Sequence, residues 1–228
     1  MNSKNDIRPV LRHGAPFAVW IAIMFLPWPG REWRYLLQTL AGVAALLWMK
    51  PWRYYGTPDR QNIVPALFTG LIMLAVWVWP EAYSPAKAGV CGEWYVRYGV
   101  LPWGVYPKPA TVATGMDWPW LLIRLCGSAF VIATIEEFFW RGLVLRSLAA
   151  RDFLTARFAP VPWLALIVSA VIFGAEHSRW IAGIIVGLVY GLLYLRTRDI
   201  WAAVFAHVVT NLGLGLYVMA GGDRGFWF

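Results

Sequence analysis

Two adjacent glutamates and an arginine stand inside a long apolar run between about Trp118 and Leu148. If this run spans a membrane, each ionisable group costs roughly 3 kcal/mol to insert, which indicates a functional role. On a helix, Glu137 and Arg141 are four residues apart and share a face, so they can form an ion pair. Glu136 points elsewhere, and apolar surroundings disfavour its charged form, which suits a base working near neutral pH. The pattern predicts that Glu137 and Arg141 form a structural ion pair and that Glu136 is the carboxylate that takes part in the reaction.

Three more polar side chains interrupt later apolar runs. His177 closes the fifth run, directly after Glu176. His207 and Asn211 lie in the last run, four residues apart and therefore on one helix face. A single intramembrane histidine is often a hydrogen-bonded core residue. Two histidines, an in-register asparagine and a Glu-Glu-x-x-x-Arg segment make that interpretation the weaker one.

These residue types could hydrolyse an acyl bond at membrane depth in two ways. In the first, Glu136 and His177 hold and deprotonate a water, while His207 and Asn211 donate hydrogen bonds to the oxyanion, each worth roughly 3–4 kcal/mol. In the second, Glu136, His177 and His207 bind a divalent metal such as zinc, which acidifies a bound water. No HExxH helix occurs, and no serine or cysteine beside these groups forms an elbow or dyad pattern. A covalent nucleophile is therefore disfavoured.

The composition is that of a membrane protein. Of the 228 residues, 60% are hydrophobic and only 14% are charged, whereas a soluble domain carries about 25% charged residues. The net charge of +8 comes from basic residues scattered singly between apolar runs, as in loops at an anionic membrane surface. We therefore expect the lipid bilayer, and no nucleic acid, as a partner.

Seven apolar runs predict membrane-spanning helices: 14–28, 35–49, 61–80, 118–146, 161–177, 180–195 and 200–220. Each is near the ~20 residues needed to cross ~30 Å of hydrocarbon, and each is too long and too uniformly apolar for a barrel strand. The connection 81–117 predicts a short interfacial or re-entrant helix around Glu93–Val105, which makes the count seven or eight. The predicted fold is all-α, a polytopic membrane helix bundle with seven or eight transmembrane helices. We expect one domain over 1–228, with a catalytic core at 118–215.

The three spaced motifs resemble those of the CAAX protease and bacteriocin-processing family of intramembrane endopeptidases, which includes the Ras-converting CAAX prenyl protease. That family carries Glu-Glu-x-x-x-Arg, Phe-x-x-x-His and His-x-x-x-Asn on successive helices. The matching segments here are Glu136-Glu137-x-x-x-Arg141, Phe173-x-x-x-His177 and His207-x-x-x-Asn211. Three motifs in order, each on a predicted span, are a specific signal.

The resemblance implies an endopeptidase that cleaves a membrane-associated or lipidated, CaaX-like peptide. It implies Glu136 as the base, His177 as its partner in holding the water, and His207 and Asn211 as oxyanion donors, with the neighbouring ion pair in support. It leaves a metal-dependent and a metal-free mechanism open. One prokaryotic branch of the family resembles accessories of exosortase-type surface sorting, and this compact, tryptophan-rich chain is a candidate member of that branch. The expected location is the prokaryotic plasma (inner) membrane, and the bias of lysines and arginines places the N-terminus in the cytoplasm.

Two other classes of function compete with proteolysis. A non-catalytic membrane partner or chaperone of a protein-sorting system would retain the pocket for binding, and its assembly function would survive Glu136→Gln. A transporter or proton relay also fits buried Glu and His residues. However, the chain shows no inverted repeat.

Two features fit the endopeptidase interpretation less well. Glu176 adds a carboxylate where the family usually has an apolar residue. In addition, strict alternation of spans puts Glu136 and His207 toward the inner side but His177 near the outer end of its run. At 1.5 Å per residue, Trp163 to His177 covers only ~21 Å. This length predicts that the helix stops mid-membrane, with His177 level with the other site residues.

Overall fold

The computed structural model describes residues 6–27, 30–82, 85–102, 118–156, 158, 160–221 and 226–227. Within these ranges the secondary structure is helical and contains no strand. Four helices are long and apolar enough to cross a membrane, namely Arg60–Pro80, Trp118–Ala149, Trp180–Thr197 and Ile200–Met219, and a shorter apolar helix covers Trp163–Ala175. The predicted all-α, polytopic membrane bundle is confirmed.

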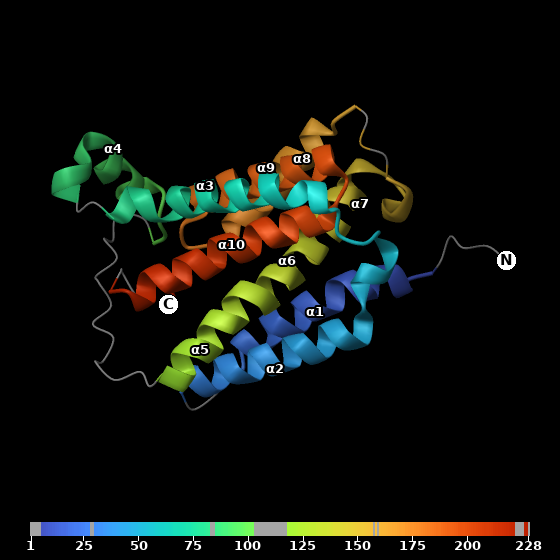
Figure 1. The fold of residues 1–228 in the computed structure, drawn as a ribbon, viewed down its shortest axis with the longest axis horizontal. Coiled ribbons are helices and arrows are strands. Elements are labelled where there is room, and N and C mark those ends of the chain that lie inside the picture. Colours follow the sequence, from blue (N-terminus) through green and yellow to red (C-terminus); the bar gives the residue numbers. More distant parts are fainter. Residues whose placement is uncertain are drawn as a thin grey trace.

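The helices run roughly along the long axis of the molecule, and α6 and α10 lie between two groups (Figure 1). One group contains α1 (Arg8–Met24), α2 (Arg31–Met49) and α5 (Trp118–Cys126). The other contains α3 (Ile63–Ala82), α8 (Trp163–Ala175) and α9 (Trp180–Thr197). The two central helices are α6 (Ala133–Phe139) and α10 (Ile200–Met219). Each of the seven predicted runs therefore coincides with a helix.

The helix predicted in the long connection begins earlier than expected. It is α4 (Pro85–Tyr98), at one end of the bundle (Figure 1). Proline suits the first position of a helix because its missing N–H needs no partner there, and Gly99 follows the last helical residue. The predicted end at Val105 lies outside the described residues.

A continuous helix over Trp118–Ala149 carries the two glutamates. It includes two π-helical segments, η4 (Gly127–Ile132) and η5 (Trp140–Val144), which flank α6; α7 (Leu145–Ala149) completes it. Wider π turns inside an α-helix rotate the following side chains and are frequent at functional sites. The side chains before and after α6 therefore point in other directions than they would on a regular α-helix.

The helix α8 is short, and a tight turn joins it to α9. Its 13 residues span about 20 Å, less than the ~30 Å of a hydrocarbon core. The end of α4 supports the turn, because Leu101 N donates to Ser178 O at 2.7 Å and Trp180 Nε1 donates to Tyr98 O at 2.8 Å. The structure thus has the short helix that the sequence predicts before His177.

Close contact between α8 and α9 depends on Gly174. A Cβ at this position would lie 2.7 Å from the Trp180 carbonyl oxygen and would also meet Ile184. We expect Gly174→Val to lower the free energy of unfolding by about 1–3 kcal/mol, as overpacking usually does. Thermal unfolding in detergent measures this, with Gly56→Ala as the control because a Cβ there meets nothing within 4 Å. Equal melting temperatures for the two variants would contradict the packing argument.

The face of α10 that carries the site is fixed by hydrogen bonds to two neighbouring helices. Thr210 Oγ1 donates to Gly70 O on α3 at 2.8 Å. Tyr190 on α9 is hydrogen-bonded to the same hydroxyl at 2.5 Å. Thr210 and Tyr190 are both fully buried. His207, one turn earlier on α10, is therefore held in a defined orientation.

Candidate active site

The predicted ion pair is present and fully buried. Arg141 NH1 donates to Glu137 Oε1 at 3.0 Å, and their side chains are 2% and 0% exposed. The arginine also donates from NH2 to Gly187 O on α9 at 3.2 Å, and its guanidinium lies 4.6 Å from the centre of the Phe173 ring. This pair joins α6 to α8 and α9.

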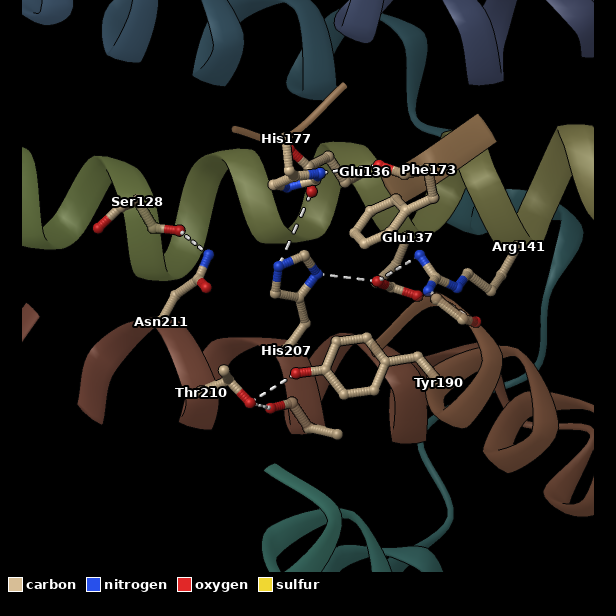
Figure 2. Close-up of polar contacts among 12 residues, drawn as sticks. Ser128, Glu136, Glu137, Arg141, Phe173, His177, Tyr190, His207, Thr210 and Asn211 are labelled. Atoms are coloured by element: carbon tan, nitrogen blue, oxygen red, sulfur yellow. Dashed lines mark hydrogen bonds and ion pairs between the residues drawn. The ribbon is translucent and has the colours of Figure 1, made fainter. Parts of the chain in front are cut away.

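Glu137 has a second partner, on α10. Nδ1 of His207 lies 2.8 Å from Glu137 Oε1, and Nε2 of the same ring lies 3.8 Å from Glu136 Oε2 (Figure 2). The contact between Glu137 and His207 fixes which edge of the imidazole faces Glu136. Sequence reasoning missed this contact, because spacing along one helix carries no information on distances between helices.

His177 lies in the turn after α8, with its ring in contact with two aromatic rings. Its Nδ1 lies 2.8 Å from Phe173 O, a backbone acceptor, so this nitrogen carries the hydrogen. The rings of Phe173 and Trp77 lie 4.7 Å and 5.6 Å from it. Nε2 is therefore the nitrogen with a lone pair available to the site.

Asn211 reaches across to the first π-helical segment. Its Nδ2 donates to Ser128 O at 2.9 Å (Figure 2). The amide is half-buried, and Asn211 and Ser128 both line the same cavity. This contact between η4 and α10 was also not predicted.

All four predicted catalytic residues line one cavity of about 290 Å³. Its lining includes Glu136, His177, His207 and Asn211, together with Trp77, Ser128, Glu176, Arg179, Phe226 and Trp227. Groups from α6, α10 and the turn after α8 thus converge, and Glu176 joins them. Of these additional residues, Glu176 alone had a signal in the sequence, as a carboxylate where the family pattern has an apolar residue.

A larger cavity of about 780 Å³ borders Ile200, the first residue of α10. Among the described residues its lining contains Arg146, Asp59 and Asp199 but no histidine or glutamate. It therefore has carboxylates but no imidazole to pair with them, and the smaller cavity is the better candidate site for the predicted hydrolysis.

The groups able to hold a metal differ from the predicted set in one member. Among the described residues, one ligand atom each from Glu136, Glu176 and His177 lie within 4.8 Å of one another. The predicted third ligand, His207, directs Nδ1 to Glu137 and lies 3.8 Å from Glu136 through Nε2. Carboxylate oxygen and imidazole nitrogen are both common zinc ligands.

Residues 118–213 match the family model described as type II CAAX prenyl endopeptidase Rce1-like. No curated protein matches the chain, and no solved structure does. The matched segment contains every predicted site residue. Residues 118–213 form an Rce1-like domain, and this match indicates a peptide hydrolase.

Proposed function

We propose that this protein is an intramembrane endopeptidase that hydrolyses a peptide bond in a membrane-associated or lipidated, CaaX-like substrate. The observation that carries the proposal is the shared cavity, which brings Glu136, His177, His207 and Asn211 together from three separate parts of the chain. A charged or imidazole group inside a membrane bundle is costly, so four polar groups around one cavity indicate chemistry. The catalytic core is residues 118–215 within a single domain, 1–228.

In the proposed reaction, Glu136 accepts a proton from a water held between its carboxylate and Nε2 of His177. The resulting hydroxide attacks the peptide carbonyl, and the protonated Glu136 then donates its proton to the leaving amine. Both electrons of the broken C–N bond leave with the amine nitrogen. The products are a new carboxylate and a new amine.

The oxyanion of the tetrahedral intermediate is stabilised by His207 and Asn211. Nδ1 of His207 is engaged with Glu137, so Nε2 is the nitrogen that faces the substrate. Stabilisation of the oxyanion by this ring requires a hydrogen on Nε2, because Nδ1 is already in contact with Glu137. Glu137 and Arg141 thus support the site without touching the substrate.

The function is tested with purified protein in proteoliposomes and a panel of short peptides, each prepared with and without a C-terminal lipid. We expect mass spectrometry to find a single internal cleavage in lipidated members of the panel. Proton or solute flux without any cleavage would instead favour a relay or transporter. A Glu136→Gln variant that keeps a partner-assembly function would favour a non-catalytic partner.

Removing the amide of Asn211 tests the oxyanion site. We expect Asn211→Leu to lower kcat by roughly 10²–10³, the usual loss for one oxyanion donor, with a smaller change in KM. Gln38→Leu is a matched control, because its buried amide donates to Trp20 O and does not line the site. If Asn211→Leu keeps more than half of the wild-type kcat, Asn211 is not an oxyanion donor.

We further propose that the protein lies in a prokaryotic plasma membrane with its N-terminus in the cytoplasm. The excess of lysines and arginines on the inner segments supports this orientation. Labelling of single cysteines with a membrane-impermeant reagent tests it. A cysteine that replaces Arg198, at the exposed end of α9, is then protected in intact cells and labelled after lysis.

A further inference from the structure

We propose that a basic cavity at one end of the bundle binds the phosphate of an anionic phospholipid headgroup. The cavity has a volume of about 390 Å³, and its lining includes Arg31, Arg34 and Arg124, together with Tyr35 and Gln38. None of the three arginines lines the catalytic cavity. The inference therefore goes beyond the proposed function and does not depend on it.

The cavity lies where the last turn of α1 meets the beginnings of α2 and α5. Figure 1 shows the first turns of α2 and α5 together at one end of the bundle. Trp33 and Trp118, in these first turns, are exposed, and the ring of Trp33 lies 4.9 Å from that of Trp120. Exposed tryptophans at the ends of apolar helices are typical of the membrane–water interface. The cavity is thus at the depth of the lipid headgroups.

The charge around the cavity favours an anion. Arg31 and Arg34 repel the positive charge of Arg124, whereas Glu32 attracts it. Within the described part of the chain, these three arginines and one glutamate leave an excess of two positive charges. A phosphodiester carries one negative charge, and it reduces the repulsion between the arginines. The planar guanidinium group also matches the geometry of phosphate oxygens.

Arg124 is held in place by aromatic rings. Its guanidinium lies 4.5 Å from the centre of the Tyr35 ring and 5.8 Å from that of Trp227. The Tyr35 hydroxyl donates to Arg124 O at 3.3 Å, which ties α2 to α5. Such cation–π contacts restrict a long side chain. Binding of an anion therefore does not have to order Arg124, and this preorganisation favours affinity.

The apolar surface beside the cavity favours a lipid over a soluble anion. Met24, in the last turn of α1, lines the cavity and is 47% exposed. Phe25 and Leu26, which follow it, are exposed as well. These side chains offer contacts to acyl chains, which a soluble phosphate lacks. Basic pockets between membrane helices are known to bind anionic headgroups in this way.

Lipid binding is measured on the full chain in detergent by native mass spectrometry. The probes are dioleoylphosphatidylglycerol and dioleoylphosphatidylcholine, which share their acyl chains and differ in headgroup charge. We expect one phosphatidylglycerol per chain to bind more than about tenfold more tightly than phosphatidylcholine, because each basic residue near an anionic headgroup contributes about fivefold, or about 1 kcal/mol. Equal affinity for the two lipids would overturn the proposal.

Substitution of the arginines tests the location of the site. We expect Arg34→Gln to bind phosphatidylglycerol about fivefold more weakly than the wild type, and the double variant with Arg31→Gln about 25-fold more weakly. Arg196→Gln, at an exposed position on α9 outside the cavity, keeps wild-type affinity. The same loss in Arg196→Gln as in Arg34→Gln would reveal general surface attraction, and this result would overturn the proposal.

Two further measurements separate charge from structure and lipid from soluble phosphate. Arg34→Lys keeps the positive charge, so we expect its affinity to lie between those of the wild type and Arg34→Gln. Equal losses in the lysine and glutamine variants would show a structural effect of Arg34 and contradict the site. We expect excess inorganic phosphate to leave most of the phosphatidylglycerol bound, because it has no acyl chain to bury. Complete displacement by inorganic phosphate would show a site for a soluble anion and overturn the assignment to a lipid.

Discussion

We expect replacement of Glu136 with glutamine to lower kcat for peptide cleavage at least about a hundredfold, the usual size of a general-base contribution. Glutamine has nearly the same volume and keeps the polar contacts of the cavity, but it cannot accept a proton from water. The carboxylate faces His177 and Glu176 and has no part in the buried ion pair of Glu137 and Arg141. We therefore expect the loss in kcat to come without unfolding.

The control for this variant is Glu32→Gln, the same chemical change in the first turn of α2. Cleavage of a lipidated peptide is followed by mass spectrometry, and circular dichroism verifies the helix content of both variants. A Glu136→Gln protein that cleaves within about threefold of the wild type, a difference under 1 kcal/mol, would show that Glu136 is not the base.

We expect replacement of Arg141 with methionine to lower the free energy of unfolding by about 3–5 kcal/mol, because it removes the arginine that pairs with a buried carboxylate. Glu137 is 0% exposed, so water cannot replace the lost guanidinium. The lost hydrogen bond to Gly187 O and the lost contact with the Phe173 ring also weaken the packing of α6 against α8 and α9. Equilibrium unfolding in mixed detergent measures the change.

A double variant separates the unpaired charge from the lost packing. Glu137→Gln combined with Arg141→Met removes both charges, so we expect it to be more stable than Arg141→Met alone. Arg196→Met, at an exposed position in the last turn of α9, is the control for loss of an arginine. Equal stability of Arg141→Met and Arg196→Met would contradict the structural role of the pair.

The sequence predicted the parts of the site that depend on short separations along the chain. Glu137 and Arg141 are four residues apart, and a helix places such residues on one face whatever surrounds it. The short α8 could also be predicted, because helix length follows directly from residue number. Likewise, apolar runs near 20 residues long located the spanning helices.

Contacts between helices could not be predicted in the same way. The hydrogen bond of His207 to Glu137 joins residues 70 positions apart, and that of Asn211 to Ser128 joins residues 83 positions apart. Their distances depend on how the helices pack and rotate. The π-helical segments around α6 change that rotation, and residue periodicity does not reveal them.

The position of Glu176 in the candidate active site depends on the turn after α8. The sequence shows an extra carboxylate next to His177, a candidate to pair with an arginine or to act on His177. The turn after α8 brings both side chains to Glu136, because α8 ends at Ala175 and the chain reverses before Trp180. The direction of a side chain in an irregular turn follows no fixed period, so only the structure could place it in the cavity.

The most direct test of the account is the fate of oxygen during cleavage of a lipidated peptide in H₂¹⁸O. If water is activated in the cavity beside Glu136 and His177, a single turnover by the wild type gives a new C-terminal carboxylate with one ¹⁸O atom. Under the same conditions the Glu136→Gln protein leaves the peptide intact. An intact peptide with both proteins, or equal yields of labelled product from both, would contradict the account.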